Sequence, residues 1–205
     1  MLPNQPRIYL ASRSPRRREL LHQIGVRFDL LLFSAAPRED AEVDELQLPG
    51  ESADDYVARV CRAKALHGVR QMQQRRLPAR LLLAADTTLD LDGETIAKPR
   101  DAADAEAILS RLSNRTHRVL TAVALVGGER IEHVVSVSEV RFRALQAAEI
   151  RHYVASGEPF DKAGAYGIQG HAAMFVAEIR GSHSGIVGLP LCETALLLRS
   201  FGYPL

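Results

Sequence analysis

Two long stretches rich in β-branched residues, at positions 119–126 and 131–142, are separated by Gly127-Gly128. Such residues favour strands, and a glycine pair between two strand-like runs is typical of a β-hairpin. Elsewhere the chain alternates short apolar runs with segments of helical periodicity. A hairpin within such an alternation predicts an α/β fold with a mixed central sheet flanked by helices.

The remaining elements are predicted from apolar runs and from boundary residues. Asp92-Gly93 indicates a tight turn between two short strands. Ser52 with Asp55 resembles a capping box, and the helix that follows has an apolar face for which Leu66 is a candidate. We expect strands at 8–11, 28–33, 81–85 and 174–179, and helices that begin near 15, 53, 101, 147 and 190.

Composition limits the classes of function. The 205 residues are 46% hydrophobic and 25% charged, which is ordinary for one globular domain spanning residues 1–205. The 26 basic and 25 acidic side chains leave a net charge of +1, which argues against nucleic acid as a partner. The sequence contains no run of about 18 apolar residues, so no membrane span is predicted. Two distant cysteines, and an N-terminus without signal-peptide character, predict a cytoplasmic protein with reduced thiols.

Three consecutive arginines, Arg16, Arg17 and Arg18, fall in the first turn of the first predicted helix. Ser14-Pro15 begins that helix, because proline is favoured at the first helical position. The helix dipole disfavours cations there by roughly 0.3–1 kcal/mol each, so the cluster needs a compensating anion. Free N–H groups at a strand-to-helix turn suit phosphate oxygens, as the guanidinium does. A solvated basic patch is the alternative, but the serines around this turn, Ser12 included, favour a phosphate site.

Further candidates lie near the middle of the chain. Asp86 follows an apolar run and is expected at the end of a strand, where open α/β sheets bind ligands. An aspartate there can hold a metal ion or accept a proton from water. An equal alternative is that it only caps the end of the strand and has no chemical role. Lys98 lies on a loop restricted by Pro99. Lys64 lies near the apolar face of its helix, so it either extends to solvent or points into a cleft.

Residues 161–170 contain three glycines and Tyr166 without helical or strand periodicity. Such glycine density permits close backbone approach to a ligand, and a structural loop is the alternative. His117 alternates with apolar residues in a strand-like pattern and is interpreted as structural. His183, in a stretch of glycine and serine, is a weaker candidate for a catalytic base.

Taken together, these segments resemble the Maf family of nucleoside triphosphate pyrophosphatases. The matching motifs occur in order, with ordinary spacing, between about residue 7 and residue 203. They are Leu10-Ala11-Ser12-x-Ser14-Pro15-Arg16-Arg17, Ala85-Asp86-Thr87, Lys98-Pro99, Thr116-His117-x-Val119-x-Thr121-Ala122, the segment 161–170, and Gly181-Ser182 followed by Val187-Gly188-Leu189-Pro190-Leu191. One such motif is a weak signal, whereas six in sequence are specific.

The resemblance implies hydrolysis of a nucleoside triphosphate between its α- and β-phosphates, which yields a monophosphate and pyrophosphate. It also implies an elongated mixed sheet with a cleft between two lobes, a divalent cation such as Mg²⁺ or Mn²⁺, and a homodimer.

The family's functional residues correspond to positions of this chain. The proton acceptor of the family corresponds to Asp86. Its phosphate-binding residues correspond to Ser12, Arg17, Lys64 and Lys98. Residues that differ between branches correspond to Arg16, Thr87 and Gln169, and this trio is similar to the branch that acts on dTTP and UTP. An amide such as that of Gln169 suits the imide edge of uracil or thymine.

Some features depart from the family pattern or leave alternatives open. The loop at 34–44 is several residues longer than is usual, so two residues are candidates for the acidic metal ligand beside Asp86: Glu45, which we favour, and Glu39. Arg13 replaces the small residue usual between the two serines. The sequence leaves two other functions open. One is a pyrophosphatase for modified purine triphosphates such as 7-methyl-GTP, and the other is a non-catalytic, nucleic-acid-binding regulator of cell division.

Overall fold

The computed structural model describes residues 5–32 and 43–205. A seven-stranded mixed sheet forms the centre of this part of the chain, in the order β2-β1-β3-β5-β6-β7, with β4 paired to β3. The strands are β1 (Ile8–Ala11), β2 (Phe28–Leu30), β3 (Leu82–Leu91), β4 (Glu94–Ile96), β5 (Thr116–Gly127), β6 (Arg130–Phe142) and β7 (Val176–Arg180). β1 is parallel to β2 and β3, and the other pairs are antiparallel. The predicted mixed α/β fold is confirmed, and β5 and β6 form the predicted hairpin.

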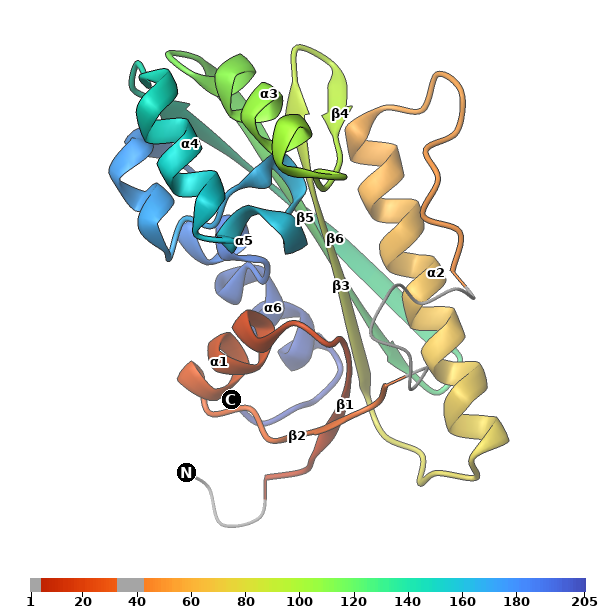
Figure 1. The fold of residues 1–205 in the computed structure, drawn as a ribbon. Helices are drawn as coiled ribbons and strands as arrows, with labels where there is room; N and C mark the ends of the chain where they lie inside the picture. The colour runs from red at the N-terminus through yellow and green to blue at the C-terminus, as the bar shows by residue number, and fades with distance from the viewer. Residues whose placement is uncertain (1–4, 33–42) are drawn as a thin grey trace.

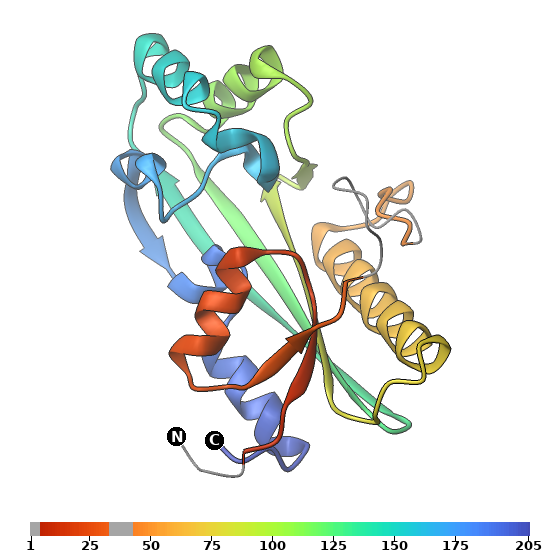
Figure 2. The ribbon, with the colours of Figure 1, turned by 60° about the horizontal axis from the view of Figure 1, so that its bottom comes forward.

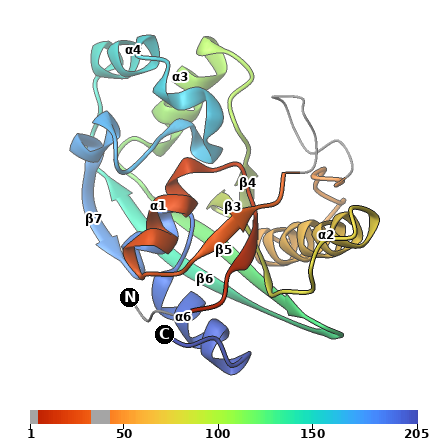
Figure 3. The same ribbon diagram turned by 90° about the horizontal axis from the view of Figure 1, so that it is seen from below.

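Helices cover both faces of the sheet (Figure 1). They are α1 (Pro15–Gln23), α2 (Ala53–Gln74), α3 (Ala102–Leu112), α4 (Ala147–Ala155), α5 (His183–Val187) and α6 (Leu191–Ser200), with 3₁₀ turns η1 (Glu158–Asp161), η2 (Ala163–Ala165) and η3 (His171–Phe175). Residues of α2 pack in one core cluster, and residues of α1, α3, α4 and α6 pack in the other; Figure 3 shows α2 apart from these helices. None of the helices in the described residues is both long and apolar enough to cross a membrane.

The helices opposite α2 fall into two groups. Figure 2 shows α1 and α6 near one end of the sheet and α3 and α4 near the other, which gives the expected two lobes. Alternate residues of β3 serve the two faces, because successive side chains of a strand point to opposite sides. Leu82 and Ala84 pack in the core cluster on the α2 side, whereas Leu83 and Ala85 pack in the larger cluster under the two lobes.

Local signals place most element boundaries correctly. The Ser52 side chain accepts a hydrogen bond from Asp55 N at 3.1 Å at the start of α2. In the turn between β3 and β4, Asp92 (φ 55°) and Gly93 (φ 86°) both adopt the left-handed conformation that a two-residue hairpin requires. These boundaries were predictable because each depends on residues that are close in sequence.

Other expectations are wrong. β3 does not end at Ala85: it continues to Leu91 because β5 pairs with it through Asp90, so Asp86 lies within a strand. Leu66 is 44% exposed, because the buried stripe of α2 runs through Cys61 and Ala65. The last strand begins at 176 rather than 174, after a 3₁₀ turn. β2 ends at Leu30, and the end expected at 33 falls outside the described residues.

Candidate active site

The strand β3 changes its partner along one edge. Residues 82–84 pair with β1, and residues 89–91 pair with β4. Between them, residues 85–88 have no strand partner on that edge among the described residues, while β5 continues along the other edge. The partner changes because the chain leaves β1 after Ala11 and turns into α1. The middle of a central strand is thereby open to a cleft of about 1360 Å³.

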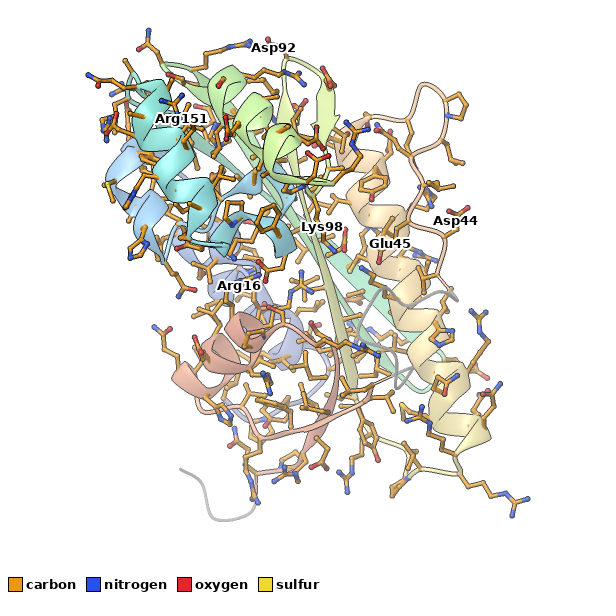
Figure 4. The ribbon with its side chains drawn as sticks, viewed as in Figure 1. Arg16, Asp44, Glu45, Asp92, Lys98 and Arg151 are labelled. Carbon is orange, nitrogen blue, oxygen red and sulfur yellow. The ribbon has the colours of Figure 1, made fainter. Side chains whose placement is uncertain are left out.

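The cleft lies between the two lobes and α2. Its walls include the segments 11–17, 43–47, 85–89, 166–170 and 186–188. Figure 4 shows Arg16, Lys98 and Glu45 around this space, and they come from α1, the loop after β4 and the segment before α2. Because neighbouring residues of β3 face opposite sides of the sheet, a ligand at the gap can reach Asp86 on the α2 side and Thr87 on the α1 side.

On the α2 side, Lys64 joins two carboxylates. Its Nζ lies 2.7 Å from Asp86 Oδ1 and 2.6 Å from Glu45 Oε1. The side chains of Lys64 and Asp86 are only 13% and 12% exposed, so this is a largely buried ion pair. Burial lowers the pKa of Lys64, but Asp86 and Glu45 raise it by more, so the pKa lies above its ordinary value and the ammonium stays charged.

The segment that carries Glu45 is held against α2. Tyr56 Oη donates to Glu45 O at 2.9 Å, and burial together with the charges of Asp86 and Glu45 raises the pKa of Tyr56 to about 12. Arg59 pairs with Glu51 at 2.6 Å and donates to Leu46 O at 2.8 Å. The glutamate is therefore placed by side chains of α2. Glu39, the alternative metal ligand, lies outside the described residues.

On the α1 side, Arg17 is the central residue. Its Nε donates to Gly188 O at 2.8 Å, Nη1 to Ser12 Oγ at 3.2 Å, and Nη2 to Thr87 Oγ1 at 3.2 Å. A guanidinium has five N–H donors, and these three bonds leave two for a ligand. Burial lowers the pKa of Arg17, and the charge of Asp86 partly opposes this effect. Arginine nevertheless remains protonated, so the cleft contains a fixed positive charge.

The hydroxyl of Thr87 has a defined orientation. Thr121 Oγ1 donates its single proton to Gly185 O at 2.8 Å. Thr87 Oγ1 lies 2.9 Å from Thr121 Oγ1 and must therefore be the donor in that pair. It also accepts from Arg17, so toward a ligand Thr87 can offer only a lone pair.

The other expected binding residues are less constrained. Arg16 Nη1 lies 3.5 Å from Asp161 Oδ2, at the limit of a hydrogen bond. Lys98 and Gln169 both line the cleft and are exposed, and neither has a hydrogen-bond partner within the described residues. Lys98 and Gln169 are thus free to turn toward a ligand, and Arg16 is held only by this long contact in the part of the chain that the structure describes.

The structure brings to one cleft the proposed proton acceptor, the favoured metal ligand, the phosphate-binding residues and the specificity residues, namely Asp86, Glu45, Ser12, Arg17, Lys64, Lys98, Arg16, Thr87 and Gln169. Tyr56, which lines the cleft, and Arg59 were not among them. For Tyr56 the signal was helical spacing, because it precedes Lys64 in α2 by eight residues, which is about two helical turns. His117 is buried and its Nε2 lies 2.8 Å from Tyr166 Oη, which confirms a structural position, and His183 is the first residue of α5.

The donor set suits a hard divalent cation. Two carboxylates, from Glu45 and Asp86, converge on one ammonium, so both can reach one point. Mg²⁺ commonly takes one or two protein carboxylates and completes its shell with phosphate oxygens and water. No cluster of three or more acidic, histidine or cysteine side chains that could hold a metal occurs in the described residues. A cation held here would therefore depend on substrate oxygens.

Comparison with known proteins identifies one family. The family model described as Maf-like protein matches residues 7–201. A relative from Aromatoleum aromaticum is 64% identical over the whole of both chains. Relatives from Dechloromonas aromatica (58% identical, 96% of this chain and 98% of theirs) and Cupriavidus pinatubonensis (59%, 94% and 95%) are also similar. All three are named dTTP/UTP pyrophosphatase.

Proposed function

The chain belongs to the Maf family, and from this premise we propose that it is a pyrophosphatase that hydrolyses dTTP and UTP to the monophosphate and pyrophosphate. Relatives that share more than half of its residues over nearly the whole chain bear that name. None of them is named for a purine triphosphate or for nucleic-acid binding, which leaves both alternatives without support from these relatives.

One observation carries the proposal: beside the gap at residues 85–88, an acidic pair and an arginine with unused N–H donors lie on the two sides of a single strand. A triphosphate needs cations to spread its charge, and an attacking water needs a proton acceptor. Arg17 offers unused N–H donors, and Lys98 is free of intramolecular partners within the described residues. Asp86 supplies the carboxylate on the opposite side.

In the proposed reaction, the oxygen of a water molecule forms a bond to one of the two phosphorus atoms joined by the α–β bridge, and the water passes one proton to Asp86. Asp86 Oδ1 contacts Lys64, and Oδ2 forms no hydrogen bond within the described residues, so Oδ2 is the available base. The α–β bridge breaks, and the bridging oxygen leaves with one of the products. Arg17, Lys64 and Lys98 hold the phosphates, with Ser12 fixed beside Arg17. A divalent cation on Glu45 and Asp86 would neutralise phosphate charge and lower the pKa of a bound water.

We propose that Gln169, Arg16 and Thr87 recognise the base. The free amide of Gln169 has a donor and an acceptor that match the alternating groups of uracil or thymine. Thr87 presents an oriented lone pair, so it would contact an N–H of the ligand rather than a carbonyl.

A substrate panel tests the proposal. Pyrophosphate release is measured from dTTP, UTP, 7-methyl-GTP and ITP, each with Mg²⁺, with Mn²⁺ and with a chelator. We expect turnover of dTTP and UTP that the chelator abolishes. Preference for 7-methyl-GTP or ITP would support the purine alternative, and tight DNA binding without any hydrolysis would support the regulator.

We also propose that the protein acts in the cytoplasm as a homodimer. Both cysteines are free thiols, as expected in a reducing compartment. Sedimentation velocity tests the oligomeric state directly, and a monomer at micromolar concentration would contradict it.

A further inference from the structure

The turn that carries Gln169 has a fixed backbone. Gly170 N donates to Gly167 O at 3.0 Å, which closes a four-residue turn. Within it Ile168 is buried, whereas the Gln169 side chain is exposed in the cleft. The position of the Gln169 amide therefore depends on what holds this turn in place.

Two side chains of the same lobe hold both ends of the turn. Glu158 Oε1 accepts from Tyr153 Oη at 2.9 Å, and Oε2 accepts from His171 N at 3.1 Å. Tyr153 Oη in turn accepts from Gly167 N at 3.2 Å. One hydrogen bond thus fixes the backbone at the start of the turn, and another fixes it just after the end.

The turn also packs directly on the glutamate. A Cβ atom added to Gly170 would lie 2.1–2.4 Å from the three atoms of the Glu158 carboxyl group. Such a distance is far below van der Waals contact, so only glycine allows this approach. Tyr153 is 3% exposed and the Glu158 side chain is 20% exposed, which means that water competes little for these bonds.

We propose that Glu158 and Tyr153 are positioning residues for base recognition by Gln169. This inference rests on the proposed function, because it assumes that Gln169 contacts the base. The Glu158 carboxylate binds Tyr153 Oη and the backbone just after the turn, and the Tyr153 hydroxyl also binds the backbone at its start. These groups therefore act through Gln169.

The test uses Glu158→Gln and Tyr153→Phe in the full-length enzyme. Glutamine has the shape of glutamate but one acceptor oxygen, so it cannot serve both Tyr153 and His171 N. Phenylalanine removes the hydroxyl and keeps the ring. Glu149→Gln is the matched control, because Glu149 pairs with Arg143 at 2.7 Å and contacts neither end of the turn.

We expect KM for dTTP to rise about tenfold in both variants, because each loses a charge-assisted or buried hydrogen bond. The value of kcat should stay within about twofold, because these bonds do not involve the reacting atoms. The preference for dTTP over ITP should fall in parallel. In a Gln169→Ala background the same substitutions should have little further effect, because the residue they position is gone.

Two results would overturn the positioning role. One is unchanged discrimination between dTTP and ITP in both variants, and the other is an effect that adds fully to that of Gln169→Ala. Amide hydrogen exchange reports these hydrogen bonds without substrate: it should become faster at Gly167 in Tyr153→Phe and at His171 in Glu158→Gln, and stay unchanged at both in Glu149→Gln. A wild-type enzyme that does not hydrolyse dTTP would instead overturn the proposed function, whatever the exchange shows.

Discussion

Lys64 Nζ lies 2.7 Å from Asp86 Oδ1, and this contact joins the middle of α2 to the middle of the central strand β3. The same ammonium contacts Glu45, so one positive charge compensates two carboxylates in a poorly hydrated place. Without that compensation, an aspartate within a strand would be costly to bury. The contact therefore connects the stability of the fold with the chemistry proposed for the cleft.

Asp86→Asn should abolish activity and preserve the fold. Asparagine keeps the size of the side chain and an acceptor for Lys64, but it cannot take a proton from water. We expect pyrophosphate release from dTTP to fall by about 10²–10⁴-fold, with an unchanged circular dichroism spectrum. Asp92→Asn is the control, since Asp92 lies in the β3–β4 turn, away from the cleft (Figure 4). Undiminished turnover in Asp86→Asn would contradict the assignment.

Lys64→Met and Lys98→Met should separate stability from binding. Removing Lys64 leaves two carboxylates without a counter-charge, and breaking a buried ion pair costs about 3–5 kcal/mol. Lys98 is exposed, so its loss should change the free energy of unfolding by less than about 0.5 kcal/mol. Both substitutions should raise KM for dTTP. Urea denaturation gives the two free energies, and equal values for the two variants would refute the structural role of Lys64.

Arg17→Lys should impair catalysis although it keeps the charge. An ammonium cannot hold Ser12, Thr87 and Gly188 together and still offer donors to phosphate. We expect kcat/KM for dTTP to fall about 10- to 100-fold, as for loss of a charge-assisted hydrogen bond. Arg18→Lys, one residue further along the same helix, should behave like wild type. Steady-state kinetics of the two variants make the comparison, and equal losses would point to general electrostatics instead.

His117 should make the fold sensitive to acid. Burial lowers its pKa from 6.5 to about 4, so between these values the unfolded chain binds a proton that the folded chain does not. The neutral ring thus contributes about 3 kcal/mol above pH 6.5 that is lost as the pH falls toward 4. His117→Gln does not titrate and can keep a hydrogen bond to Tyr166. Urea unfolding at pH 7, 6 and 5 should show a shallower loss for this variant, and parallel curves would exclude His117 as the origin.

Much of the fold was predictable because its signals are local. The cap at Ser52, the turn at Asp92-Gly93 and the hairpin around Gly127-Gly128 each depend on residues within a few positions of one another. The site was harder, since the position of Lys64 near an apolar helix face fitted either solvent or a cleft, and Pro99 restricted the loop of Lys98 without showing what that loop faces. The family resemblance made both lysines candidates, and the structure places both in the lining of the cleft.

By its own pattern the sequence determined which residues form strands and helices, and which side chains are chemically suited to phosphate. Only the tertiary structure decided that Asp86 lies within a strand, in the part of β3 between the residues that pair with β1 and those that pair with β4. It also decided that Glu45 reaches Lys64, and that the Thr87 proton is committed to Thr121. The physical reason is that periodicity and capping act over one or two turns of chain. Strand register and buried charge pairing depend instead on segments tens of residues apart.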